Sequence, residues 1–251
     1  MSPTLAIDGH VAYLTLHRPQ AANKLTPDDL PVLIQHVDTV NRTPEVVVLV
    51  LRAEGKYFCS GFDISELATQ SQTEGRSFGE MVDVFENCRA VTIAAVHGGV
   101  YGGATDLVLA CDFRVGARSA EMFMPAARLG LHYYQSGMER YVSRLGLDTA
   151  KRLFLTAEKL DGAAMRDCGF LTQLVDDAAA LDAEVQRLRT VLAGMAPLAL
   201  LGMKKHLNQI ARGTADAAAI SREVQRTVAS EDLAEGGRAW REKRTPVFQG
   251  R

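Results

Sequence analysis

The stretch VTIAAVHGGVYGGATDLVLA, residues 91–110, joins an apolar run to a glycine-rich turn and then to a second apolar segment. Its first six residues, Val91–Val96, have the length and composition of a strand that is buried on both faces. Four glycines interrupt the apolar pattern over residues 98–103, and the segment that carries Leu107–Leu109 then predicts a helix. The stretch therefore predicts a buried strand, a tight turn and a helix, in that order.

A second buried strand with a glycine turn lies earlier in the chain. Val46–Leu51 is an almost uninterrupted run of β-branched residues and leucine, and the turn GKYFCSGFDI, residues 55–64, follows it. Two further strands are expected around the Asp-Gly turn near the N-terminus, Leu5–Ile7 and Val11–Leu16. Two helices are expected after them, one with Thr26 as its N-cap that runs to about Val40, and one over Phe78–Arg89. These repeated units predict an α/β protein with mostly parallel crossover connections.

The pattern changes after Ala178, where apolar residues recur at helical spacing. Three amphipathic helices are expected, followed by a short charged tail: near Leu181–Ala193, Pro197–Ala211 and Ala215–Ser230. No low-complexity segment or linker separates them from the preceding part of the chain. We therefore expect a core over residues 1–195 and a C-terminal helical segment over residues 196–251, attached to that core as an appendage.

Composition excludes several classes of protein. The 251 residues carry 28 Lys and Arg against 30 Asp and Glu, a net charge of −2, which argues against a protein that binds nucleic acid by neutralising phosphates. No apolar run approaches the ~18 residues of a membrane helix, and the first residues show no secretory signal, so the expected location is cytoplasmic. The four scattered cysteines predict free thiols and no metal site: Cys59, Cys88, Cys111 and Cys168.

Both glycine turns follow a buried strand, so each can direct backbone N–H groups into a cleft. The second turn also starts a helix, whose N-terminus carries a partial positive charge. Two N–H groups that converge from two loops form an oxyanion hole, which stabilises negative charge on a carbonyl oxygen. The alternative interpretation is that the glycines only permit tight turns and close packing of helix against sheet. Neither turn is a dinucleotide-binding or P-loop motif, and Ser60 is not in the GxSxG context of a hydrolase nucleophile.

In this order and spacing the two turns resemble those of the crotonase superfamily, the enoyl-CoA hydratases and isomerases. The resemblance covers nearly the whole chain: RPQAANKL at 18–25, GGATDL at 102–107 with Cys111 and Asp112, LGL at 129–131, residues 161–175, and the tail residues 230–232, 235–236 and 242–244. It implies a spiral of strand–strand–helix units with a C-terminal helical segment. It also implies a coenzyme A thioester as substrate, no further cofactor, and a homo-oligomer that is a trimer or a dimer of trimers.

The resemblance assigns roles to individual residues. The oxyanion donors would be the backbone N–H groups of Phe62 and Gly103. Contacts with coenzyme A would come from eight residues: Gln20, Ala22, Lys24, Lys56, Ser60, Ile64, Trp240 and Lys243. Lys56 can equally be a solvated loop lysine, and Trp240, the only tryptophan, is more typical of a core or interface anchor.

Two positions depart from the hydratases of this family, which resemble one another in using a pair of glutamates. Water addition needs one carboxylate to activate water and a second group to protonate the α-carbon. The first family position is Asp106 here, and the second falls at or beside Ala126, between Pro125 and Ala127, where no side chain can move a proton. The next loop contains His132, Tyr133 and Tyr134 in place of a Pro-Gly-rich turn. Tyr133 resembles a tyrosine of the family's methylmalonyl-CoA decarboxylase branch, which also lacks the second glutamate.

These features predict an enzyme that isomerises or decarboxylates an acyl-CoA thioester, with an oxyanion-stabilised enolate as the common step. The expected catalytic residues are Asp106 as a shuttle or orienting carboxylate, with Tyr133 or His132 as proton donor. The plainer interpretation of residues 132–134 is a structural histidine and tyrosines that line the wall. Two alternatives stay open, an enoyl-CoA hydratase that relies on Asp106 alone and a crotonase scaffold that binds acyl-CoA without catalysis.

Overall fold

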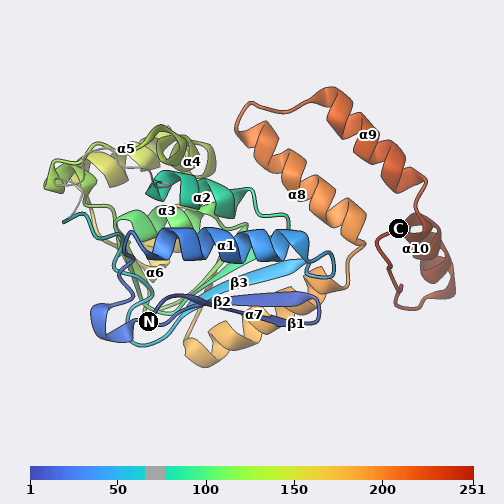
Figure 1. Cartoon of the computed structure of the whole chain (residues 1–251), viewed down its shortest axis with the longest axis horizontal. Coiled ribbons are helices and arrows are strands. Elements are labelled where there is room, and N and C mark those ends of the chain that lie inside the picture. Colours follow the sequence, from blue (N-terminus) through green and yellow to red (C-terminus); the bar gives the residue numbers. More distant parts are fainter. Residues whose placement is uncertain (66–76) are drawn as a thin grey trace.

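The computed structural model describes residues 1–65 and 77–251 and has a mixed α/β fold (Figure 1). A six-stranded sheet has the order β1-β2-β3-β4-β6-β9, and a smaller sheet has the order β5-β7-β8. In the larger sheet β1 pairs antiparallel with β2, and the remaining neighbours pair in parallel. The strands are β1 (Thr4–Asp8), β2 (Val11–Leu16), β3 (Val48–Ala53), β4 (Val91–Val96), β5 (Gly99–Tyr101), β6 (Phe113–Ala117), β7 (Glu121–Phe123), β8 (Leu160–Asp161) and β9 (Gln173–Val175).

The central strands are buried on both faces because helices cover each side of the larger sheet (Figure 1). Along β3, Leu49 and Leu51 join the apolar cluster that includes side chains of α1 (Asp29–Arg42), α2 (Phe78–Glu86) and α3 (Gly103–Ala110). Val48 and Val50 join a second cluster with α7 (Ala178–Ala193). Successive side chains of a strand point to opposite faces, so a strand covered on both sides needs a continuous apolar run. The sequence prediction of an α/β core with mostly parallel strands is confirmed.

Shorter elements connect these layers. They are η1 (Pro19–Ala21), η2 (Ala126–Leu129), α4 (Gln135–Leu145), α5 (Leu147–Thr156) and α6 (Gly162–Asp167). The smaller sheet places β5, and with it the start of the second glycine turn, beside β7. As a result, the turn before α3 and the segment that leads from β7 into η2 lie on the same side of the molecule.

The predicted element bounds are accurate for β2, β4 and α8 and are shifted for several other elements. β3 begins at Val48 rather than Val46, because pairing with β2 starts at the Val11–Val48 position while the Val46 N–H bonds back to Thr43. α1 begins after Asp28 rather than after Thr26. Thr26 is not the N-cap: its N–H and hydroxyl both donate to the carboxylate of Asp29, at 2.8 and 3.0 Å. α2 ends at Glu86, three residues before the predicted end.

The C-terminal segment contains one more helix than the sequence prediction. α8 (Pro197–Ala211) has the predicted bounds, α9 (Ala217–Val228) lies within its predicted range, and both extend away from the sheet (Figure 1). The expected charged tail is wrong, because residues 231–242 form helix α10 (Glu231–Glu242). Ser230 caps this helix by accepting the Leu233 N–H at 3.1 Å, and two acidic residues occupy its first turn.

A buried lysine attaches the C-terminal segment to the core. Lys204 of α8 reaches the Asp112 carboxylate at 2.8 Å and the Ala90 carbonyl at 2.5 Å. α7 contributes to the apolar cluster on one face of the sheet, so the chain leaves the sheet between α7 and α8. The predicted boundary at residues 195/196 falls in this connection and stays a prediction.

All four cysteines are free, as predicted from their spacing. Within residues 1–65 and 77–251, no three His, Cys, Asp or Glu side chains are grouped so that they could hold a metal ion. In the same residues no helix is both long and apolar enough to cross a membrane.

Candidate active site

The two glycine turns lie side by side and are hydrogen-bonded to each other. The Phe58 and Cys59 N–H groups donate to the Gly99 carbonyl at 3.0 and 3.1 Å, and the Tyr101 N–H donates to the Cys59 carbonyl at 3.0 Å. Gly61 has a φ of +104°, and a Cβ at this position would lie 2.8 Å from the Tyr101 carbonyl oxygen and 3.5 Å from the Gly103 nitrogen. The close approach of the turns therefore requires glycine at position 61.

Phe62 and Gly103 each carry a backbone N–H with no acceptor among the residues that the structure describes. Around Phe62, the Leu25 N–H donates to the Gly61 carbonyl and the Asp63 N–H donates to the Leu25 carbonyl, both at 2.8 Å. Gly103 is the first residue of α3, where a helix leaves its N–H groups unpaired. Two free donors thus occur in adjacent turns, and one of them belongs to a helix N-terminus.

An apolar cavity of about 1370 Å³ lies next to these turns. Phe62 and Gly103 line it, together with part of α1, the start of α2 and residues 123–134. The Phe62 and Phe78 rings lie 5.3 Å apart between centroids, and Phe78 lies 6.4 Å from Tyr134. Ligand sites are usually apolar cavities of this kind with a few polar groups, and the two unpaired N–H groups belong to residues of its wall.

Tyr133 and Tyr134 form a stacked pair on the cavity wall, with ring centroids 4.4 Å apart. The Tyr133 hydroxyl donates to the Tyr134 hydroxyl at 3.3 Å, and the Tyr134 hydroxyl donates to Oδ2 of Asp106. Burial raises the pKa of both phenols. The pair therefore connects the cavity to Asp106 through two hydroxyl groups.

Asp106 does not reach the cavity. Its side chain has no exposed surface and lies behind the Tyr134 hydroxyl, where Nη1 of Arg140 contacts Oδ2 at 2.5 Å. From the sequence, Asp106 was expected to shuttle protons or orient groups in the site. In the structure its carboxylate is paired with Arg140 and is separated from the cavity by the side chain of Tyr134. Burial raises the pKa of Asp106, and Arg140 and Tyr134 oppose this without returning the pKa to its ordinary value.

His132 and Ala126 both line the cavity. His132 is exposed, and its Nδ1 lies 2.8 Å from the Tyr133 carbonyl oxygen. A carbonyl only accepts hydrogen bonds, so Nδ1 carries a proton and Nε2 is the nitrogen that can accept or release one. Ala126 is 5% exposed and brings no carboxylate to the wall. Among the described residues that line the cavity, Asp38 of α1 is the one acidic side chain.

The structure brings together six of the eight residues expected to contact coenzyme A. Asn23 is buried and donates to the Glu54 and Tyr57 carbonyls at 2.8 and 2.9 Å, and the Ser60 N–H donates to the Ala22 carbonyl at 2.9 Å. These bonds hold the segment of Gln20, Ala22 and Lys24 against the loop of Lys56, Ser60 and Ile64.

The two lysines of this group already have partners within the chain. Lys24 Nζ lies 2.5 Å from the Asp63 carboxylate, and Lys24 lowers the pKa of Asp63. Lys56 Nζ lies 5.3 Å from the centre of the Tyr57 ring. Both are partly exposed, so each ammonium group can still contact an anionic ligand.

Trp240 and Lys243 lie apart from the other expected contacts. Trp240 is on α10 and is 87% exposed, and Lys243 is the C-cap of the same helix. Neither lines the cavity, because α8–α10 extend away from the sheet and α10 lies at the far end of this segment (Figure 1).

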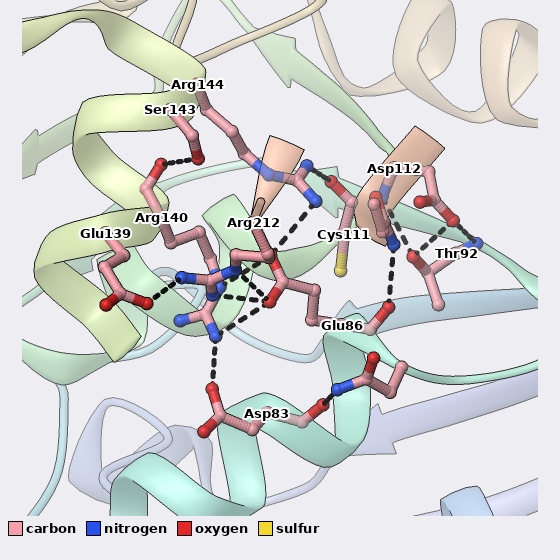
Figure 2. A network of polar contacts seen from close by, with 12 residues as sticks. Asp83, Glu86, Thr92, Cys111, Asp112, Glu139, Arg140, Ser143, Arg144 and Arg212 are labelled. Atoms are coloured by element: carbon pink, nitrogen blue, oxygen red, sulfur yellow. Dashed lines mark hydrogen bonds and ion pairs between the residues drawn. The ribbon is translucent and has the colours of Figure 1, made fainter. Parts of the chain in front are cut away.

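A charged network behind the tyrosine pair was missed by the sequence analysis. Arg140 of α4 has no exposed surface and contacts Asp83 at 2.6 Å and Glu86 at 3.1 Å, in addition to Asp106. Arg212, the C-cap residue of α8, contacts Glu86 at 2.5 Å (Figure 2). Arg140 lies 34 residues from Asp106 and 54 from Glu86, so no local pattern relates them.

The mostly parallel α/β fold, with two glycine turns meeting beside an apolar cavity, is that of the crotonase superfamily. The sequence model described as enoyl-CoA hydratase/isomerase matches residues 6–251. The chain belongs to the enoyl-CoA hydratase/isomerase family.

Individual relatives and solved structures agree with this assignment. The chain is 31% identical over 254 residues to the human enoyl-CoA hydratase domain-containing protein 2, covering 97% of the chain and 87% of the relative. It is 30% identical over 213 residues to the peroxisomal Δ(3,5)-Δ(2,4)-dienoyl-CoA isomerase of Arabidopsis thaliana, covering 78% and 77%. The crystal structure of an enoyl-CoA hydratase from Bacillus anthracis superposes with a TM-score of 0.91 at 25% identity and covers 100% of both chains.

Proposed function

We propose that this protein is an enzyme that binds an acyl-CoA thioester with its carbonyl oxygen between the N–H groups of Phe62 and Gly103, and that it stabilises the enolate formed there. The observation that carries this proposal is the pairing of the two glycine turns, which leaves these two N–H groups unpaired beside the cavity. An enolate oxygen gains negative charge as it forms, so two fixed donors lower the energy of the transition state more than that of the substrate.

The enolate forms by loss of CO₂ or by removal of a proton, rather than by addition of water, and it is then protonated on carbon. Hydration needs a carboxylate that activates water, and the two positions where the hydratases resemble one another in carrying glutamate bring none to the cavity wall, because Ala126 has no carboxylate and Asp106 lies behind Tyr134. Decarboxylation needs no base, and isomerisation needs one group that takes a proton and returns it. His132 and Tyr133 line the cavity, as do Asp38, Tyr101 and Tyr134, and they are the groups that we assign to the proton transfer.

The names of the relatives support an acyl-CoA substrate and favour two reaction types. The relative from Arabidopsis is described as a dienoyl-CoA isomerase, which supports isomerisation. The human relative is described as an enoyl-CoA hydratase domain-containing protein, which keeps hydration with Asp106 as the only carboxylate as the second candidate. A scaffold that binds acyl-CoA without turnover is the third.

The C-terminal segment supports assembly into a trimer or a dimer of trimers. Met203, Leu207 and Ile210 lie four and three residues apart on one face of α8 and are 60%, 65% and 57% exposed. A single chain leaves this apolar stripe in water, and a second copy would cover it.

The reaction is tested with a panel of 2-enoyl-, 3-enoyl- and malonyl-type CoA thioesters, with products identified by mass spectrometry. A shifted double bond or loss of CO₂ is the expected result. A hydrated product as the main outcome supports the second candidate and contradicts the proposal. Saturable binding of the thioesters without any product identifies the chain as a scaffold.

A further inference from the structure

Few groups stabilise the negative charge of the Asp106 carboxylate. The side chain has no exposed surface, and its Oδ1 has no hydrogen-bond partner among the described residues. Oδ2 contacts Nη1 of Arg140 at 2.5 Å and accepts the Tyr134 hydroxyl. Within residues 1–65 and 77–251, Arg140 is the one cation that forms an ion pair with Asp106. A buried carboxylate without a paired cation takes up a proton, because burial disfavours the charged form.

The charge of Asp106 sets the direction of the hydrogen bonds that lead to the cavity. A carboxylate can only accept, so Tyr134 must donate to it. A phenol has a single proton, so the Tyr134 oxygen can only accept from Tyr133, which donates to it across 3.3 Å. The proton of Tyr133 is thereby directed away from the cavity, and its oxygen lone pairs remain for a ligand. A protonated Asp106 could itself donate, and both phenols could then reverse.

Ion pairs keep Arg140 in place, and a glycine on the same helix leaves room for the two tyrosines. Asp83 and Glu86 of α2 contact its guanidinium at 2.6 and 3.1 Å, so three carboxylates surround one arginine. Burial alone lowers the pKa of Arg140, but Asp106 and Glu86 together raise it above its ordinary value. Gly137, one turn earlier on α4, leaves room for the tyrosines, since a Cβ there would lie 2.5 Å from Cε1 of Tyr133 and 3.0 Å from Oδ2 of Asp106.

We propose that Arg140 is a positioning residue of this active site: it keeps Asp106 as a carboxylate, and that carboxylate fixes Tyr134 and Tyr133 with their protons directed inward. Tyr133 then presents an acceptor to the cavity, and Nε2 of His132 transfers the proton. After loss of CO₂, a protonated His132 gives its Nε2 proton to the α-carbon and is reprotonated from solvent. In isomerisation, Nε2 of neutral His132 takes a proton from one carbon of the substrate and returns it to another. The role of Arg140 in catalysis rests on the function proposed above. Its effect on the charge of Asp106 is independent of that function.

Several ionisable groups surround Asp106 and must be included in any pH experiment. They come from α2, from the loop before α4, from α4 itself and, through Glu86, from α8: Asp83, Glu86, Tyr133, Tyr134, Arg140, Tyr141, Arg144 and Arg212. Of these, Arg212 is the useful comparison. It contacts Glu86 at 2.5 Å, as part of the same network, but it does not contact Asp106.

The test is infrared spectroscopy of the folded protein at neutral pH, where a protonated carboxylic acid has its own carbonyl band. We expect Arg140→Gln to show such a band that the wild type lacks, and the double variant Arg140→Gln/Asp106→Asn to lose it again. Arg212→Gln should show no band assignable to Asp106. A folded Arg140→Gln variant without the band overturns the proposal, whatever its activity, so this result is independent of the proposed function.

The kinetic arm uses whichever thioester the panel identifies. In Arg140→Gln the acid limb of the pH–rate profile should move to higher pH, with turnover at neutral pH reduced at least about ten-fold, the factor for one pKa unit. Activity should recover as pH rises, with KM unchanged, and Arg140→Lys should restore part of it. A uniform loss at every pH contradicts a positioning role. If Arg140→Gln does not fold, Asp106→Asn serves instead, and unchanged turnover in that variant overturns the proposal.

Discussion

At the scale of a single residue, two substitutions of Gly103 measure the contribution of its backbone N–H group. Proline at this position removes the N–H, and proline is tolerated at the first residue of a helix. Alanine keeps the N–H, and both substitutions add a Cβ 2.8 Å from the Phe78 ring. The difference between the two variants therefore measures the N–H and cancels the contact with Phe78.

We expect Gly103→Pro to lower kcat by about 10²–10³-fold relative to Gly103→Ala, as in other oxyanion holes. Binding of an acyl-CoA product should change much less, because the carbonyl of the ground state carries little charge. Steady-state kinetics and calorimetric titration check both values. Equal kcat in two folded variants would remove Gly103 from the oxyanion hole.

Substitutions of His132 and Tyr133 distinguish the roles of these two residues in proton transfer. His132→Gln should lower turnover by about 10²–10⁴-fold, the usual worth of a general acid or base. Tyr133→Phe keeps the ring stacked on Tyr134 and removes a hydroxyl whose proton is directed inward, so its loss should be smaller and its acyl-CoA affinity nearly unchanged. A larger loss in Tyr133→Phe than in His132→Gln would make the phenol the proton donor.

Ala126 marks the position of the missing carboxylate. Its side chain is 5% exposed and lines the cavity, so Ala126→Glu places a carboxylate at the wall. We expect this variant to gain hydration of a simple 2-enoyl-CoA that the wild type performs weakly or not at all, measured by loss of the enoyl absorbance. Ala126→Gln, which has the same shape without the charge, is the matched control and should gain nothing.

At the scale of elements, Glu86 joins three helices. Its carboxylate contacts Arg140 of α4 at 3.1 Å and Arg212, the C-cap residue of α8, at 2.5 Å, while its carbonyl accepts a hydrogen bond from Nδ2 of Asn208 of α8 at 3.0 Å. Burial raises the pKa of Glu86, but the two arginines together lower it below its ordinary value. The C-terminal segment is thus attached to the core next to the charged groups that hold Asp106 (Figure 2).

This attachment predicts a dependence of stability on pH. A carboxyl with a lowered pKa stabilises the folded state above its unfolded pKa, about 4.3 for glutamate, and this stabilisation is lost as pH falls through the lower folded value. The pKa of Asp106 is raised, so this carboxyl favours the folded state at low pH, and its contribution is lost as pH rises through its folded value. The protection of α8 against hydrogen exchange, corrected for the intrinsic rate at each pH, should therefore fall at acid pH in the wild type.

Arg212→Gln should show faster exchange of α8 already at neutral pH, with a loss of about 2 kcal/mol for a hydrogen-bonded charge. Arg226→Gln is the control and should change stability by less than about 0.5 kcal/mol, because the Arg226 side chain is 61% exposed and its Nη1 lies 3.7 Å from Glu223. Similar exchange in both variants would show that Glu86 does not hold α8 in place.

At the scale of the whole molecule, the C-terminal segment leaves apolar residues in water. Besides the stripe on α8, Leu233 and Trp240 of α10 are 56% and 87% exposed. We expect a trimer or hexamer at micromolar concentration by light scattering. Leu207→Glu should shift it toward monomer, whereas Leu155→Glu, on α5 and 73% exposed, should not. A monomeric wild type contradicts the proposed assembly.

The sequence by itself determined the core and the position of both glycine turns. Val91–Val96 is a strand as predicted, because a run of six residues that is apolar except for Thr92 suits a strand covered on both faces, and α8 begins at Pro197, where proline favours a helix start. The helix at Glu231–Glu242 was predictable in principle, since Ser230 and two acidic residues mark its start. These are local signals, carried by neighbouring residues.

Tertiary packing decided the chemistry behind the wall. The sequence identified Asp106, Tyr133 and His132 as candidates, yet only the fold shows that Asp106 points to Arg140 and that Tyr134 lies between it and the cavity. Arg140 meets its three carboxylates across 34 to 57 residues of chain. No sequence periodicity predicts contacts between residues so far apart in the chain, because these contacts depend on how α2, α3 and α4 pack. A buried carboxylate then pairs with the cation that this packing brings to it.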